Sequence, residues 1–287
     1  MQICIKDVEI LLNDFIKKRR TELGISRKKL CSDLCSESTL YRFEMGLSDI
    51  NAHLLIEICK RLKFGKVVIT DVNFTEKEYA QFLLIQHYIY QRNITELEKI
   101  IESAESKSKV WTKIITWCQA VIYFYKGEYK RCENIISKDL SISKPKNSLD
   151  LLILNTLILS HLSQNSYKEA LEVATTCMHY LETHRVESTE LNFKIRYSYA
   201  HSLHQNGNKK EAETIILELI DALIHEKTFF LLGKCYFFLY ALHKDEKVQL
   251  SNKYLKMSYM TFIIENSPIP NQVLEEIKKL PDSSLFL

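Results

Sequence analysis

A pair of helices that recurs five times constrains the fold of most of this chain. Five similar four-residue patterns end at Leu97, Cys132, Ala170, Ala212 and Leu250, which lie 35, 38, 42 and 38 residues apart. A polar turn precedes each pattern, and a long apolar helix precedes each turn. A helix pair cannot bury its apolar side alone, so repeated pairs stack into a solenoid. The period therefore predicts an all-α helical-repeat domain.

The first helix of each pair is expected to line the concave surface of the solenoid. These five helices are predicted over residues 76–90, 110–126, 149–164, 190–206 and 228–243. A final helix, 271–280, lies between Pro270 and Pro281 and is expected to cap the stack. Polar groups within the otherwise apolar first helices are where a ligand could be held.

Glycine and proline are rare throughout the chain, which strengthens the all-α prediction. The 287 residues include 6 Gly and 4 Pro, far below the roughly 12% of average usage. The sequence also contains no glycine-rich phosphate loop, no GxSxG and no HExxH. We therefore expect a protein that is not an enzyme, with no cofactor and no metal site.

Residues 24–46, GISRKKLCSDLCSESTLYRFEMG, predict two short helices joined by a tight turn. Ser26 is a good N-cap for a helix over 27–34, and Ser36 is a good N-cap for a second over 37–45. Gly46 occupies a C-cap position. This is a helix-turn-helix with a basic, hydroxyl-rich outer face.

The basic charge is concentrated near this motif. Residues 1–66 hold 13 Lys+Arg and 9 Asp+Glu, a net charge of +4, whereas the remainder carries −1. The imbalance favours a polyanionic partner for the N-terminal part. The run 17–20 (KKRR) follows an expected first helix and is either a solvated surface or a further set of phosphate contacts.

No segment is expected to cross a membrane, and the thiols are expected to be reduced. The most apolar run, 149–162, is short and interrupted by polar residues, and the N-terminus lacks the pattern of a secretory signal. The eight cysteines mostly occupy apolar helical positions. Cys31 and Cys35 could alternatively form a metal or redox pair, although no second pair matches them. A soluble, cytoplasmic protein follows.

A helix-turn-helix presents the N-terminal residues of its second helix to base edges in the major groove. Base contacts are therefore expected from Ser36, Glu37, Ser38 and Thr39, with Arg42 one turn later. Glu37 could accept from a cytosine amino group or simply favour the helix dipole. Phosphate contacts are expected from Arg27, Lys28 and Lys29.

The pattern SRKKLCSDLCSESTLYRFEMGLSDI resembles the helix-turn-helix of the Xre/Cro class. Its ending, from Tyr41 through Gly46 to Ile50, is similar to the Rgg/MutR branch of peptide-responsive regulators, which belong with the PlcR and PrgX groups. The repeats, most clearly YKGEYKRC and SYKEAL, resemble tetratricopeptide (TPR) repeats. The resemblance implies a DNA-binding domain over 1–66, a linker over 67–75, and a right-handed TPR-like solenoid over 76–287 that binds peptide and dimerises.

This chain departs from the family pattern at two positions. Arg27 stands where a Gln is usual, and Tyr41, which also belongs to the expected DNA-binding surface, stands where a Ser is usual. Arg27 can still bind a phosphate. The change at Tyr41 leaves the identity of the DNA site open.

Asn155 is the clearest candidate for binding a peptide, because an amide side chain can both donate to and accept from a peptide backbone. The alternative is an Asn bonded to a neighbouring helix. The resemblance implies that asparagines on the inner helices hold the peptide, which favours Asn155 and adds Asn192. Further candidates are Arg196, Tyr197, Tyr236 and Tyr240, although tyrosines at helical spacing are more often core residues.

The sequence thus predicts a homodimeric transcription regulator that binds double-stranded promoter DNA and responds to a short signalling peptide, as in quorum sensing. The dimer follows from symmetric DNA half-sites together with the family resemblance. The alternative is a TPR-like protein-interaction module that does not bind DNA directly.

Overall fold

The computed structural model describes residues 13, 16–21, 23–48, 50, 54, 57–58, 61–62, 71–72, 74–104, 108–139, 144–186, 188–265 and 268–280. Within these residues every regular element is a helix, which confirms the all-α prediction. None of the described helices is long and apolar enough to cross a membrane.

The chain divides into two compact units. The first contains residues 1–142 and 147–149, and the second contains 143–146 and 150–287. Both expected domain boundaries, after residue 66 and after residue 75, fall inside the first unit and stay predictions. Much of the expected linker, residues 67–70 and 73, lies outside the described residues.

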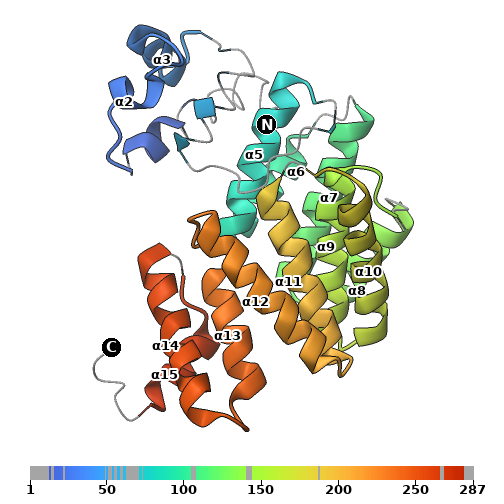
Figure 1. The fold of residues 1–287 in the computed structure, drawn as a ribbon. Coiled ribbons are helices and arrows are strands. Elements are labelled where there is room, and N and C mark those ends of the chain that lie inside the picture. Colours follow the sequence, from blue (N-terminus) through green and yellow to red (C-terminus); the bar gives the residue numbers. More distant parts are fainter. Residues whose placement is uncertain are drawn as a thin grey trace. The chain divides into compact units, whose positions relative to one another are not determined.

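The first unit contains the two short helices of the N-terminal motif, α2 (Arg27–Cys31) and α3 (Glu37–Glu44), drawn in blue in Figure 1. Serine N-caps start both, as expected. Helix α2 ends three residues before position 34, because Ser32 leaves the helical conformation with ψ 129° and Asp33 is left-handed with φ 62°. A left-handed residue cannot continue an α-helix.

Gly46 ends α3 by adopting φ +68°. Its N–H donates to the carbonyl of Phe43 at 2.9 Å, and the N–H of Leu47 donates to the carbonyl of Arg42 at 2.8 Å. These two bonds form a Schellman motif, which satisfies carbonyls that the helix leaves open. Beneath the helices, Leu30, Leu40 and Phe43 are buried in the core of this unit.

The first unit continues with two helix pairs. Helix α5 (Glu76–Gln91) packs on α6 (Ile94–Glu102) and on α7 (Lys109–Tyr125), and α7 packs on α8 (Tyr129–Asn134). Helix α8 passes directly into a π-helical segment, η1 (Ile135–Asp139).

The second unit contains three further pairs and a terminal helix (Figure 1). These are α9 (Ser148–Ser163), whose first two residues belong to the first unit, α10 (Tyr167–Thr183), α11 (Thr189–Gln205), α12 (Lys209–His225), α13 (Leu232–His243), α14 (Val248–Glu265) and α15 (Asn271–Lys278). From α10 onward, each helix packs against the next.

The first helices of the pairs begin and end within one residue of their expected bounds, except α13. Helix α13 starts at Leu232 rather than at 228, because Leu231 is left-handed with φ 63°. Side-chain periodicity does not reveal such a break.

Four of the five turns between paired helices share one backbone motif. Arg92, Gly127, Asn165 and Gly207 each follow a first helix and adopt positive φ, between 54° and 90°. In each turn this residue donates to a carbonyl three residues back, and the next residue donates to one five residues back. The turn between α13 and α14 differs: Glu246 and Lys247 both donate to the carbonyl of His243.

Candidate DNA-binding and peptide-binding sites

The hydroxyl groups expected to contact bases cluster at the N-terminus of α3. The Ser36 hydroxyl accepts from the backbone N–H of Thr39 at 3.1 Å, and it lies 2.8 Å from Ser38 Oγ and 2.7 Å from Thr39 Oγ1. Ser36, Glu37 and Ser38 are exposed. The N-cap that starts the helix therefore also fixes the side chains that its first turn presents.

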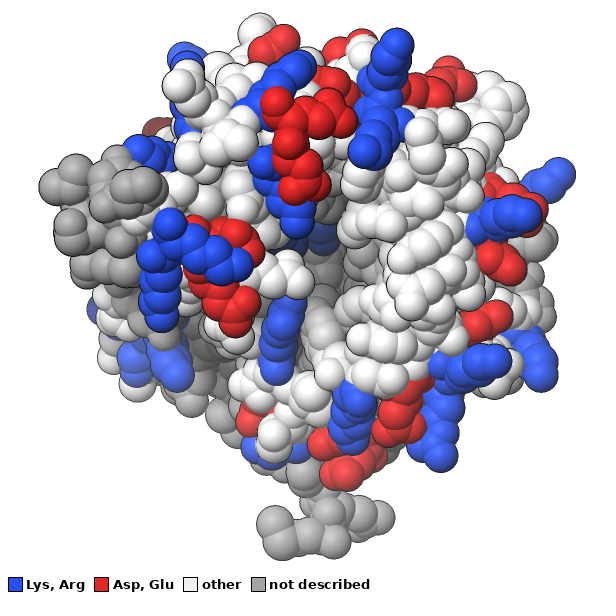
Figure 2. Space-filling model, turned by 90° about the horizontal axis from the view of Figure 1, so that it is seen from below, with Lys and Arg blue, Asp and Glu red and all other residues white. Residues whose placement is uncertain are grey.

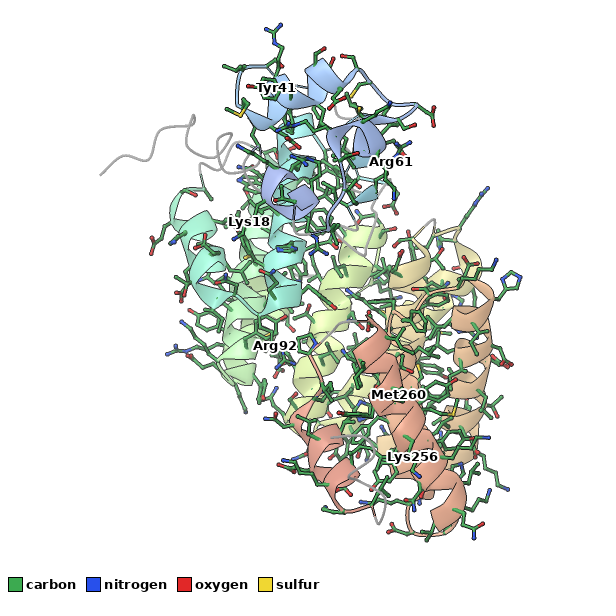
Figure 3. The ribbon with its side chains drawn as sticks, turned by 90° about the vertical axis from the view of Figure 1, so that its left-hand side faces the viewer. Lys18, Tyr41, Arg61, Arg92, Lys256 and Met260 are labelled. Atoms are coloured by element: carbon green, nitrogen blue, oxygen red, sulfur yellow. The ribbon has the colours of Figure 1, made fainter. Side chains whose placement is uncertain are left out.

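Several basic side chains in this part of the chain are open to solvent. Lys28, Lys29 and Arg42 are exposed and have no ion pair with a described residue. Lys18, labelled in Figure 3, is exposed as well. By contrast, the face of the molecule in Figure 2 shows basic and acidic side chains intermingled.

Glu44 is the most enclosed charged group of the motif, with 1% of its surface exposed. Its carboxylate accepts from Arg20 Nε at 2.5 Å, from Arg20 Nη2 at 3.0 Å and from Arg27 Nε at 2.6 Å. Arg20 also donates to the carbonyl of Ile25 at 3.1 Å. Arg20 is thus a buried structural residue. It belongs neither to a solvated surface nor to a set of phosphate contacts, the two alternatives expected for the 17–20 run.

These contacts determine the ionisation of Glu44. Burial alone would raise the pKa of the Glu44 carboxyl, but hydrogen bonds from Arg20 and Arg27 outweigh burial and lower the pKa from its ordinary value of 4.5. Glu44 therefore remains charged, and it holds Arg20 and Arg27 together within the motif.

Arg27 and Tyr41, the two departures from the family pattern, lie against each other. The guanidinium carbon of Arg27 is 5.0 Å from the centroid of the Tyr41 ring, which is a cation–π distance. Tyr41 is 45% exposed and, like Arg61, belongs to the N-terminal part of the chain in Figure 3.

The sequence did not single out Arg61. This side chain donates from Nη1 to the carbonyls of Leu30 and Ser32, at the end of α2. A basic residue at the end of a helix satisfies open carbonyls. Its partners lie about thirty positions away in sequence, so no local pattern could have indicated them.

Asn155, in the second unit, lies on α9 with 8% of its surface exposed. Its Oδ1 accepts from the hydroxyl of Ser198 on α11 at 2.7 Å. Among the described residues, its Nδ2 donates to none. Asn155 therefore bonds a neighbouring helix and also retains two N–H donors, so neither interpretation of this residue excludes the other.

Arg196 and Tyr197, on α11, point to different neighbours. Arg196 Nη2 donates to Glu218 on α12 at 2.9 Å. The Tyr197 ring packs edge-on against Phe238 at 6.3 Å, and burial raises the pKa of its phenol. Arg196 is thus bonded to the side chain of Glu218, whereas the Tyr197 ring packs against the hydrophobic core of the second unit.

Tyr236 and Tyr240, on α13, are both buried. Tyr236 stacks on Tyr254 at 6.4 Å, and the Tyr240 hydroxyl donates to Glu276 on α15 at 2.6 Å. Burial, followed by this bond, raises the pKa of Tyr240. Tyr240 thus ties α13 to the terminal helix.

Asn192 lines a cavity of about 300 Å³, together with Val186, Thr189, Phe193, Ala222, His225 and Glu226. It precedes Ser198 by six residues on the same helix, so its side chain leaves α11 about 120° away from the side that meets Asn155. The structure therefore places the two asparagines on different sides of α11. Their roles in peptide binding stay predictions.

Six cysteines lie among the described residues and all are free thiols; five of them are buried, and Cys35 is partly exposed. Burial and the neighbouring Cys31 raise the pKa of the Cys35 thiol. A raised pKa disfavours the thiolate that metal binding and redox chemistry require.

Comparison with known proteins supports this architecture. Residues 16–65 match the helix-turn-helix family HTH_3, while no curated protein matches the sequence. Bacillus thuringiensis PlcR in complex with the peptide PapR7 and DNA aligns with a TM-score of 0.58 at 18% identity, covering 89% of this chain and 95% of that one. Its apo form aligns with a TM-score of 0.55 at 17% identity, covering 89% and 94%. Likeness at this identity concerns the fold, and it confirms a helix-turn-helix followed by helical repeats.

Proposed function

We propose that this protein is a cytoplasmic transcription regulator that binds promoter DNA through α2 and α3 and is controlled by a short signalling peptide bound to its helical repeats. The observation that carries the proposal is the combination of a helix-turn-helix family match with a fold shared with PlcR along 89% of the chain. The PlcR structure holds both a peptide and DNA.

DNA binding is supported by what the motif leaves exposed. The first turn of α3 presents Ser38 and Glu37 to solvent, and Lys28, Lys29 and Arg42 are free of ion pairs with described residues. Hydroxyls can donate to or accept from base edges, whereas basic side chains neutralise phosphates. Both classes of side chain are exposed on α2 and α3.

Peptide binding is supported by Asn155. Its Oδ1 is satisfied by Ser198, and its Nδ2 has no described partner. Two N–H donors held in place by a hydrogen-bonded amide suit the carbonyl groups of an extended peptide. A peptide that binds one arrangement of the repeats more tightly than another shifts the population toward it and changes DNA affinity by the same factor.

A homodimer is the form that symmetric half-sites require. Helix α14 exposes Met260, Ile263 and Ile264 at i, i+3 and i+4, which forms an apolar stripe on the second unit. Such a stripe suits contact with a second copy. Light scattering should give twice the chain mass for the wild type and a smaller mass for Ile263→Lys.

DNA binding is tested by gel shift on the DNA upstream of the protein's own gene. The wild type should bind with an affinity that falls steeply with salt, and Arg42→Ala should weaken binding at least about fivefold, because a base contact is worth about 1–3 kcal/mol. Lys138→Ala, an exposed lysine far along the chain, is the control. A protein with no salt-sensitive affinity would instead be a protein-interaction module.

Peptide binding is tested by calorimetry with peptides encoded beside the gene. Asn155→Ala should weaken binding, whereas Ser198→Ala, which breaks the same internal bond and leaves the Asn155 amide in place, should weaken it much less. Equal affinity of the wild type and Asn155→Ala would remove Asn155 from the site.

A further inference from the structure

The contacts around Tyr41 divide the expected DNA-binding residues into two roles. We propose that Tyr41 determines sequence specificity by packing against a thymine methyl group, and that Arg27 is a positioning residue that holds the Tyr41 ring rather than a phosphate anchor. This inference rests on the proposed DNA-binding function.

Tyr41 lies on the side of α3 that faces solvent. Leu40, Phe43 and Glu44 are buried, whereas Tyr41 and Arg42 are exposed. Tyr41 follows Ser38 by three residues and precedes Met45 by four, so the three share one stripe of the helix. Tyr41 therefore continues the surface that begins at the hydroxyl cluster.

This stripe becomes apolar at its C-terminal end. Tyr41 is 45% exposed, Met45 46% and the following Leu47 63%. Phosphates and most base edges require hydrogen-bond donors or acceptors, whereas the thymine C5-methyl is the apolar group in the major groove. An exposed aromatic ring on a recognition helix therefore matches thymine more closely than it matches phosphate.

Arg27 is immobilised by contacts on two sides. Its Nε donates to Glu44 at 2.6 Å, and Glu44 is itself held by two bonds from the buried Arg20. Its guanidinium lies 5.0 Å from the Tyr41 ring centroid. The guanidinium is thus bonded to a carboxylate and lies over the Tyr41 ring.

This arrangement separates positioning from anchoring. A phosphate anchor needs a charge that solvent can reach, but the side chain of Arg27 is only 28% exposed and its Nε is bonded to Glu44, the carboxylate that it shares with Arg20. A positioning residue needs a fixed plane, which arginine supplies and lysine does not. The two family departures, Arg27 and Tyr41, therefore act as one coupled pair.

The test uses full-length protein and duplexes that the wild type selects from a random pool. In each selected duplex, thymines are replaced one at a time by deoxyuridine, which lacks only the methyl group. One replacement should weaken the wild type about three- to fivefold, the value of one buried methyl. Tyr41→Ser should be insensitive to that replacement, and Tyr41→Phe should remain sensitive.

Arg27 is tested with Arg27→Lys, which keeps the charge and loses the plane, and with Arg27→Gln. Both should lose sensitivity to the methyl group, as Tyr41→Ser does, with an unchanged dependence of affinity on salt. If Arg27→Lys keeps the sensitivity while Arg27→Gln lowers the salt slope by about one, Arg27 is a phosphate anchor and the proposal fails.

The Tyr41 variants do not touch Glu44, so they decide the matter even if an Arg27 variant fails to fold. Equal sensitivity to deoxyuridine in the wild type and Tyr41→Ser would overturn the proposal while leaving DNA binding intact. A wild type that selects no sequence and shows no salt-sensitive affinity for any duplex would instead overturn the proposed function.

Discussion

Glu44 and Asn155 are both polar side chains buried among helices, but they differ in how completely they are satisfied. Glu44, in the first unit, receives three hydrogen bonds from two arginines. Asn155, in the second unit, receives one from Ser198, and its Nδ2 has no described partner. A saturated buried group stabilises the fold, whereas one with spare donors can also bind a ligand. Burial alone does not distinguish these two cases.

The largest effect is expected from Glu44→Ala. Removing the carboxylate leaves the Arg20 guanidinium buried without a counter-charge, which should lower the free energy of unfolding by about 3–5 kcal/mol. Hydrogen exchange of the α3 amides measures it. Glu96→Ala, which removes a surface pair with Lys99, should change stability by less than about 1 kcal/mol. Similar values for the two variants would show that Glu44 is not a saturated structural group.

On acidification, the two units should lose stability in different pH ranges. Because the pKa of Glu44 is lowered in the folded state, its stabilisation is complete above about 4.5 and is lost as the pH falls through its folded pKa. Burial, with a smaller contribution from His204, lowers the pKa of His201 on α11 from 6.5. As the pH falls, His201 is therefore protonated in the unfolded chain before it is protonated in the folded chain. The stability of the second unit should decrease below about pH 6.5.

Hydrogen exchange at stepped pH checks this order. The opening free energy of the α11 amides, corrected for the intrinsic exchange rate at each pH, should fall between pH 6.5 and 4.5, where that of the α3 amides should be unaffected. The double variant His201→Gln, His204→Gln should remove the first window only, because burial lowers the pKa of both histidines. Opening free energies that fall in both helices over the same pH range would contradict the separation.

A smaller loss is expected from breaking the bond between Asn155 and Ser198. Asn155→Ala and Ser198→Ala should each cost about 1–3 kcal/mol, since each leaves a buried partner unpaired. The double variant should cost little more than either single one, because the bond is lost once. Chemical denaturation of all four proteins gives the coupling. Additive losses would mean that the bond contributes nothing to stability.

The smallest loss of stability is expected from alanine at the turn glycines, and it should be equal in the two units. Gly127 and Gly207 adopt φ +76° and +90° at equivalent turns, so an alanine at either position should cost about 1 kcal/mol through backbone strain. Arg92→Gly, at the corresponding turn after α5, should change little, because relief of strain offsets the added chain entropy. Thermal melts check all three. Unequal costs at Gly127 and Gly207 would show that the turns are not equivalent.

Local patterns predict the elements of this chain well. Ser26 and Ser36 cap α2 and α3 as expected, and four first helices agree with their expected bounds within one residue. Caps, turn residues and helical periodicity act over a few positions, so the sequence displays them directly.

Partners distant in sequence could not be predicted in this way. Arg20 appears as one member of a solvated basic run, yet it pairs with Glu44 across 24 positions. The sequence suggests Arg27 as a phosphate contact but does not reveal its bond to Glu44 or its contact with the Tyr41 ring. Likewise, the sequence suggests Asn155 but not its bond to Ser198 on another helix. Each case depends on which helix faces lie together, and periodicity does not specify that.

The carboxylate that serves two arginines also limits how this protein can evolve. Glu44 cannot be lost without stranding the buried Arg20, and Arg27 can change only to residues that Glu44 tolerates. Tyr41 is less constrained, because it meets this group of charged side chains through a contact between its ring face and Arg27. Substitutions should therefore be tolerated more readily at Tyr41 than at Glu44, so the exposed surface of α3 can vary while the buried network beneath it stays constant.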